Sequence, residues 1–298
     1  MAAASCFICG GGRRVPSTRD YLACLDCGHE VLRGGQSQTF MINDKIDPSR
    51  RPKPDLLVRF QSSVVEKARK SRRLLVDIGS GSGKFLFHNR AAFASLLGVE
   101  VTPENVRYAT EVLGLPVRTS LPDDLPAPSV VTFWHSLEHI PVEAMDAILG
   151  KLSGACDAES RVVISVPNNR SLQYQWFREG YAYYDAPNHL HQFSPQSLDR
   201  LMRRHGFKKT KTFFSPAYIV FGYVQGVLNL IMPIHNYFYY RSKRGADFGF
   251  SRPKLTLLDF INSIMLIVAI PISLILSLAD FLLSQRRGVL TTCYRKTA

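Results

Sequence analysis

Four cysteines near the start of the chain have the spacing of metal ligands. They form two Cys-x-x-Cys pairs, Cys6 with Cys9 and Cys24 with Cys27. Four thiolates can hold Zn²⁺ tetrahedrally, and the bound ion supplies folding free energy that so short a segment cannot obtain from a core of its own. Such pairs are more typical of a metal site than of a disulfide framework, and they indicate a reducing compartment. We predict a zinc ribbon over residues 1–35, with Zn²⁺ as a structural cofactor.

A glycine-rich turn further along the chain could hold a small ligand. Asp77 is followed by Gly79, Gly81 and Gly83 in the run VDIGSGSGKF. Because glycines lack a Cβ atom, a turn from a strand into a helix can be tight there, and its backbone can lie against a ligand at the carboxyl edge of a sheet. Glu100 ends the next predicted strand, where an acidic side chain can accept hydrogen bonds from the two hydroxyls of a ribose.

Two common nucleotide motifs do not fit the spacing of these glycines. The phosphate loop GxxxxGK[ST] would need a glycine where Ile78 stands and a hydroxyl where Phe85 stands. The dinucleotide fingerprint GxGxxG would need its third glycine at Lys84. The pattern that remains is DxGxGxG at the end of a buried strand.

The elements that must position these residues alternate between strand and helix. Short apolar runs alternate with segments of helical spacing, which predicts an α/β fold with a doubly wound, Rossmann-like sheet of seven strands. We expect the strands at residues 74–78, 96–100, near 117, 130–135, 162–166, 208–215 and 288–296. We expect helices at residues 56–69, 84–90, 103–113 and 142–152, and another that ends near residue 205.

The motifs together resemble those of class I S-adenosylmethionine-dependent methyltransferases, over roughly residues 55–215 and the last ten or so. The run VVTFWHSLEHIP is similar to a subgroup with LEH after the fourth strand, and some members of that subgroup carry an N-terminal zinc ribbon. SVPNN and APNHLHQFSPQSLDRLMRRHGF fit the same subgroup, although Ser129 stands where it usually has Asp. The resemblance implies that S-adenosylmethionine is bound by Asp77, Gly79, Gly81, Gly83, Glu100 and His135.

Methyl transfer needs an aligned acceptor, and an oxygen or nitrogen acceptor also needs a base. We expect His139 or His189 to be this base, with Glu138, Asp185 and His191 as further candidates. The alternative is that these side chains cap a helix or satisfy backbone groups. A nucleic-acid amino-methyltransferase would carry a motif of the NPPY type after the fourth strand, so the run HSLEHIP disfavours a nucleic-acid acceptor.

A hydrophobic insertion separates the last two predicted strands. It holds two charge-free runs, 212–240 and 260–279, and each is long enough to cross a membrane if helical. The loop RSKRGADFGFSRPK between them is basic, as are the flanking segments, so a spanning hairpin would place basic residues on the wrong side. Prolines and asparagines also interrupt the runs, at Pro216, Asn229, Pro233, Asn262 and Pro271. We therefore favour a hairpin that lies in the membrane surface over one that spans it, with a soluble helical subdomain as the remaining alternative.

The predicted organisation is a zinc ribbon (1–35), a linker (36–54), a methyltransferase domain (55–215 and 285–298) and a membrane-associating insertion (216–284). The net charge of +13 favours an anionic partner, for which a lipid surface qualifies. We expect a methyltransferase at the cytoplasmic face of a membrane, acting on a lipid-linked sugar, a saccharide or a quinone-like lipid. A non-catalytic scaffold and a nucleic-acid methyltransferase are the competing hypotheses.

Overall fold

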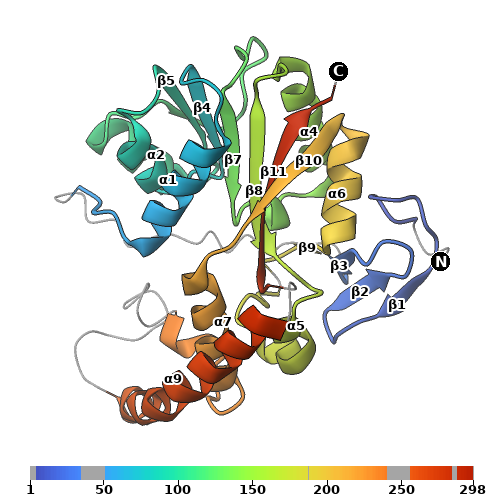
Figure 1. Cartoon of the computed structure of the whole chain (residues 1–298), viewed down its shortest axis with the longest axis vertical. Coiled ribbons are helices and arrows are strands. Elements are labelled where there is room, and N and C mark those ends of the chain that lie inside the picture. The colour runs from blue at the N-terminus through green and yellow to red at the C-terminus, as the bar shows by residue number, and fades with distance from the viewer. Residues whose placement is uncertain (1–4, 35–50, 187, 240–255, 284–286, 298) are drawn as a thin grey trace. The chain divides into compact units, whose positions relative to one another are not determined.

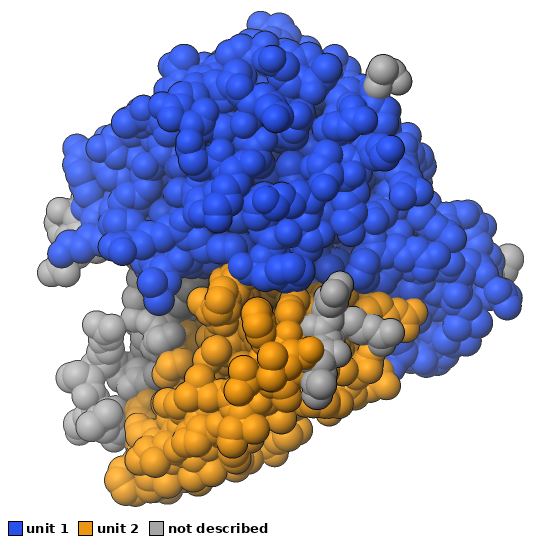
Figure 2. Space-filling view, viewed as in Figure 1, with its two compact units in different colours: residues 1–167, 187–214, 290–298 blue, residues 168–186, 215–289 orange. Residues whose placement is uncertain are grey.

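The computed structural model describes residues 5–34, 51–186, 188–239, 256–283 and 287–297. Most of the predicted linker and the whole basic loop at 241–254 lie outside these residues. The chain divides into two compact units, shown in different colours in Figure 2. The first comprises residues 1–167, 187–214 and 290–298, and the second comprises residues 168–186 and 215–289.

A seven-stranded sheet forms the centre of the first unit (Figure 1). Its order is β10 (Phe207–Phe213), β11 (Val289–Lys296), β8 (Arg161–Pro167), β7 (Val130–Trp134), β4 (Leu74–Ile78), β5 (Ser95–Val99) and β6 (Val117–Arg118). The pairs from β8 to β6 are parallel, whereas β10 and β11 are antiparallel to each other. This confirms the predicted Rossmann-like sheet, including its completion by the end of the chain after a long insertion.

Successive residues of the central strands face two different cores, because side chains alternate across a sheet. Val76 and Val131 belong to one hydrophobic cluster, and their neighbours Leu75 and Val130 belong to the other. The first cluster includes side chains of α4 (Val142–Ala155) and α6 (Pro195–Arg204). The second includes side chains of α1 (Leu56–Ala68), α2 (Lys84–Asn89) and the π-helical turn Tyr108–Val112, which continues α3 (Pro103–Arg107). Helices therefore cover both faces, as a doubly wound fold requires.

The N-terminal segment forms a second, smaller sheet in the first unit. Strands β1 (Arg14–Pro16), β2 (Tyr21–Cys24) and β3 (Glu30–Leu32) form an antiparallel meander. The fourth strand of this sheet is β9 (His191–Gln192), which pairs with β3 through Glu30 opposite Gln192 and Val31 opposite His191. The ribbon thus shares a sheet with a histidine-bearing segment that lies far along the chain.

The second unit is helical. It contains α5 (Leu172–Phe177), a 3-10 turn at Arg178–Gly180, α7 (Pro216–Asn229) and α9 (Leu257–Leu283). Pro216 starts α7 and Asn229 ends it, as the sequence predicts, and α7 is too short to cross a hydrocarbon core. Among the described residues one helix is long and apolar enough to do so, at Leu257–Leu282.

The expected break at Pro271 and Asn262 is wrong. Both residues lie inside α9, which runs without interruption for 27 residues. A proline removes one backbone hydrogen bond, and in a long apolar helix the remaining bonds hold the helix on both sides of it.

Candidate active site

The glycine turn after β4 has the left-handed backbone that its sequence requires. Gly79, Gly81 and Gly83 have φ values of 74°, 53° and 78°. A Cβ at Gly79 would lie 2.4 Å from the Cβ of Ser136, and one at Gly83 would lie 2.8 Å from Leu115 Cδ1. At these two positions the missing Cβ makes room for protein side chains. The sequence explains the glycines by the close approach of a ligand and does not predict this packing.

Glu100 ties the end of β5 to this turn. One oxygen of its buried carboxylate accepts a hydrogen bond from the Gly81 amide at 2.7 Å, and the other accepts one from the Thr102 amide at 2.8 Å. A carboxylate can accept about four hydrogen bonds, so acceptor capacity remains for a vicinal diol such as that of a ribose. The turn and this acid fit the cofactor site that the sequence predicts.

Asp77 lies beneath the turn, within the sheet. Its carboxylate accepts a hydrogen bond from Thr132 Oγ1 at 2.6 Å and is almost completely buried. Burial raises the pKa of Asp77 to about 7, the Thr132 hydrogen bond opposes this rise, and the charge of Glu100 adds to it. The hydroxyl from β7 is a partner of Asp77 that sequence reasoning missed.

Ser129 occupies the position where the related subgroup usually has Asp. Its hydroxyl lies 2.8 Å from Ser71 Oγ and accepts a hydrogen bond from the Arg73 amide at 2.8 Å. In this chain the residue therefore joins the starts of β4 and β7.

The turn after β7 brings the predicted acidic and histidine residues together. Ser136 Oγ donates to the Ile78 carbonyl at 2.6 Å, which fixes this turn against the end of β4. His135 has a φ of 53°, and its Nδ1 lies 3.3 Å from an oxygen of the fully buried Glu138. Burial raises the pKa of Glu138, but His135, His189 and His139 outweigh it and leave this pKa below its usual range.

The two predicted bases lie side by side. The rings of His139 and His189 meet edge to face with their centroids 4.5 Å apart. One ligand atom each from Glu138, His139 and His189 lies within 4.8 Å of the other two. His139 Nδ1 lies 2.9 Å from the Asn188 carbonyl, to which it donates its proton, so its Nε2 is left with a free lone pair. We call these three residues the acid–histidine cluster.

His191 has a structural role next to this cluster. Its Nε2 lies 3.0 Å from the Ile140 carbonyl and its Nδ1 lies 3.2 Å from His29 Nε2 of the ribbon. Burial and the charge of His29 lower the pKa of His191 to about 3, so the ring is neutral near pH 7. Tyr21 of the ribbon also donates to the His189 carbonyl at 2.7 Å. Asp185 belongs to the second unit.

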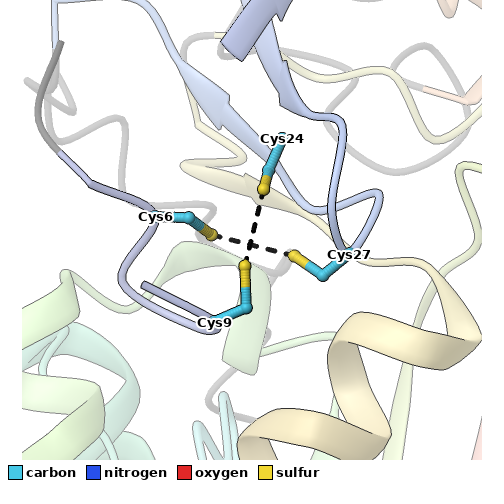
Figure 3. A group of neighbouring side chains, drawn as sticks. All are labelled: Cys6, Cys9, Cys24 and Cys27. Carbon is cyan, nitrogen blue, oxygen red and sulfur yellow. Dashed lines mark hydrogen bonds between the residues drawn. The ribbon is translucent and has the colours of Figure 1, made fainter. Parts of the chain in front are cut away.

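The four predicted zinc ligands converge in the ribbon, with their sulfur atoms pointing toward one another (Figure 3). Cys6 and Cys27 have sulfurs 3.7 Å apart, and those of Cys9 and Cys24 are 3.6 Å apart. Zinc–sulfur bonds of about 2.3 Å place tetrahedral ligands about 3.8 Å from one another, so the cluster fits this ion. The hydrogen bond between Cys27 and Cys6 lowers the pKa of Cys6 and raises that of Cys27, so without an ion it favours one thiolate in this pair.

Comparisons with known proteins agree with this fold. A family model described as a methyltransferase domain matches residues 50–212, more than half of the 298-residue chain. No curated protein matches the chain.

Solved structures are similar at low sequence identity. The [4+2]-cyclase SpnF is 13% identical with a TM-score of 0.50, and the match covers 86% of this chain and 87% of SpnF. An S-adenosylmethionine-dependent methyltransferase from Archaeoglobus fulgidus is 17% identical with a TM-score of 0.47, and covers 81% of this chain and 93% of its own. Another from Clostridium acetobutylicum is 7% identical with a TM-score of 0.46, over 81% of this chain and 91% of that one. At 13% identity SpnF shows similarity of fold alone. The family model covers the glycine turn, Glu100 and the acid–histidine cluster. The chain therefore belongs to the methyltransferase domain family, and its seven-stranded sheet is that of a class I S-adenosylmethionine-dependent methyltransferase.

Proposed function

We propose that this protein transfers a methyl group from S-adenosylmethionine to a lipid-linked, saccharide or quinone-like acceptor at a membrane surface. The catalytic part of the proposal is supported by the proximity of two turns, the one after β4 and the one after β7. The glycine turn follows β4, Glu138 and His139 of the acid–histidine cluster follow β7, and these strands are parallel neighbours. Both turns therefore leave the sheet at the same edge, and the hydrogen bond from Ser136 to Ile78 joins them.

The glycine turn and Glu100 would hold the cofactor, which supplies an electrophilic methyl group on a sulfonium. The acceptor atom forms a bond to the methyl carbon as the carbon–sulfur bond breaks, and the electron pair stays on sulfur. His139 or His189 would accept the proton that an acceptor hydroxyl gives up, with the buried negative charge of Glu138 stabilising the protonated ring. These roles agree with the placement of Glu138 and His139 after β7 and with the contact between the His139 and His189 rings.

Zn²⁺ in the ribbon would have a structural role. The ribbon supplies Tyr21 and His29, which contact His189 and His191 respectively. A folded ribbon therefore supports the segment that carries one of the two candidate bases.

The membrane part of the proposal is supported by the two faces of α9. Five of its polar side chains are buried, namely Asp259, Asn262, Ser273, Ser277 and Asp280, and one, Ser263, is exposed. Its outward side chains are large and apolar, among them Phe260, Ile267, Ile275, Leu278 and Phe281, each more than half exposed. A helix on the surface of a soluble protein shows the opposite pattern. This inverted pattern fits contact with lipid, and since the described residues include only one helix of spanning length, we favour a helix lying in the membrane surface.

The acceptor class is tested by following a labelled methyl group. The full chain is incubated with radiolabelled S-adenosylmethionine and a total membrane extract, and the extract is then partitioned. We expect the label in the organic phase or in lipid-linked saccharide. Label confined to RNA or DNA would contradict the proposal, and no transfer by protein that binds the cofactor would favour the scaffold hypothesis.

A further inference from the structure

We propose that Glu138, His139 and His189 form a second metal site, which binds one divalent transition-metal cation. The site is distinct from the four cysteines of the ribbon. Its ligands are one carboxylate and two imidazoles, whose nearest donor atoms all lie within 4.8 Å of one another. Ligand atoms bound at about 2.1 Å to one ion lie about 3.0–3.5 Å from one another. Movements of the side chains by roughly 1 Å would therefore bring these three donor atoms to binding distance of one ion.

Glu138 provides the first argument. Its side chain has no exposed surface, and in the described part of the chain neither carboxylate oxygen accepts a hydrogen bond. Its negative charge is offset by His135, whose Nδ1 lies 3.3 Å from one oxygen, and by the neighbouring imidazoles of His189 and His139. A buried carboxylate without hydrogen-bond donors is costly, and buried charges are normally paired or coordinate a metal. A cation between Glu138 and the two imidazoles would supply the missing partner.

His139 provides the second argument. A metal-binding imidazole usually donates its other N–H to a backbone carbonyl or a carboxylate, which fixes the tautomer and the ring orientation. His139 Nδ1 makes this contact with the Asn188 carbonyl at 2.9 Å. The residue after that carbonyl is His189, whose own carbonyl is held by Tyr21 Oη at 2.7 Å. The backbone that carries the second imidazole is thus fixed from the ribbon side.

The ligand chemistry separates this site from the ribbon. Thiolates select zinc, whereas a set of two imidazoles and one carboxylate suits several first-row divalent ions and leaves coordination positions open. An open position next to the cofactor edge can take the hydroxyl of an acceptor and lower its pKa. His139 and His189 would then bind the metal instead of acting as the base, and the metal would make the acceptor oxygen nucleophilic. This catalytic role rests on the proposed function, but the existence of the metal site does not.

The site is tested by adding Co²⁺ to the untagged, zinc-loaded full chain. We expect one Co²⁺ per chain, with visible absorption typical of nitrogen and oxygen ligands and without the charge-transfer band of thiolate ligands. Glu138→Gln, His139→Ala and His189→Ala should each weaken Co²⁺ binding by at least about tenfold, because changes around metal ligands already cost 10–100-fold. Retained zinc in each variant shows that it is folded.

His205→Asn is the matched control. His205 also lies beside a carboxylate, with its Nε2 3.1 Å from Asp146 Oδ1, but it is not part of the cluster. We expect this variant to bind Co²⁺ as the wild type does. Absence of Co²⁺ binding at the wild-type protein, or binding that all three cluster variants leave unchanged, would overturn the inference. Methyl transfer that persists after chelation would exclude a role in catalysis while leaving the site itself in place, and failure of the lipid assay would bear on the proposed function alone.

Discussion

The glycine turn shows at the scale of single residues how a motif can serve packing and binding together. Gly79 and Gly83 accommodate Ser136 and Leu115, while the amide of Gly81 is held by Glu100. The sequence predicts the turn and the acid from spacing alone. It could not predict that Thr132 contacts Asp77 or that Ser136 contacts the end of β4. Neither residue belongs to the glycine motif, and only the pairing of β7 with β4 in the sheet brings them close to it.

Gly79→Ala should destabilise the fold by about 2–4 kcal/mol, since it combines a left-handed backbone with overpacking against Ser136. Combining it with Ser136→Gly removes the clash and leaves the backbone cost of about 1 kcal/mol together with the loss of the Ser136–Ile78 hydrogen bond, which the single variant Ser136→Gly measures by itself. Chemical denaturation of the two single variants and the double variant forms a double-mutant cycle that measures this coupling. If the changes in unfolding free energy of the two single variants add up to that of the double variant, the two residues do not clash.

Asp77 predicts a specific pH dependence of stability. Its pKa rises from 3.8 to about 7 on folding, so the folded state holds a proton that the unfolded state has lost between these values. Stability from this group therefore falls as the pH rises from about 4 to about 7, by at most about 1.4 kcal/mol per pH unit. Asp77→Asn should remove that slope, as measured by urea denaturation across the range, whereas the exposed Asp124→Asn should not. A slope that is equal in Asp77→Asn and the wild type would contradict this account.

At the scale of elements, strand and helix periodicity predicted the sheet well, because each central strand is a short apolar run that faces two cores. The link between the ribbon and β9 was not predictable. It joins segments separated by about 160 residues, and the two-residue strand His191–Gln192 has no periodic pattern of its own. The course of α9 through Pro271 was missed for a related reason, since a local helix breaker does not determine the structure of a long apolar helix.

Removal of zinc should loosen β9 as well as the ribbon. We propose that the four cysteines hold Zn²⁺, so the ribbon without this ion should lose folding free energy. β9 would then lose its partner β3, and His189 and Leu190 before it would lose the hydrogen bonds that their carbonyls accept from Tyr21 and the Leu32 amide. Hydrogen exchange after chelation should be faster in a peptide covering residues 188–193 and unchanged in one covering β4. Addition of Zn²⁺ should restore the protection. Unchanged exchange in residues 188–193 of the metal-free protein would show that β9 does not depend on the zinc ribbon.

At the scale of the whole molecule, the described chain consists of an α/β unit with an attached ribbon and a helical unit with an apolar outer surface on α9. The two charge-free runs predicted from the sequence have different structures. The first contains a short, largely buried α7, and the second is part of a long helix in which all polar side chains except Ser263 are buried. Composition alone could not show this, because hydropathy does not tell which face of a helix is covered.

Ile267→Glu combined with Ile275→Glu should therefore reduce membrane binding. Both side chains are about 70% exposed on α9, and charged side chains in a lipid interface lose the burial of apolar surface. Flotation with vesicles that contain anionic lipid should recover the wild-type protein in the lipid fraction and much less of this variant. Leu56→Glu, at a residue 74% exposed on α1, is the matched control and should float as the wild type does. Equal flotation of all three proteins, or none by the wild type, would contradict membrane contact through α9.

The central claim is that the glycine turn and Glu100 bind S-adenosylmethionine, and calorimetric titration with its product S-adenosylhomocysteine tests this most directly. We predict one binding event per chain for the wild type. Glu100→Gln should weaken it by about tenfold or more, because a charged acceptor of hydrogen bonds is worth about 1.5–3 kcal/mol. Glu104→Gln on the neighbouring helix α3 should bind like the wild type. Absence of binding by the folded protein, or equal affinity in Glu100→Gln and the wild type, would contradict the account.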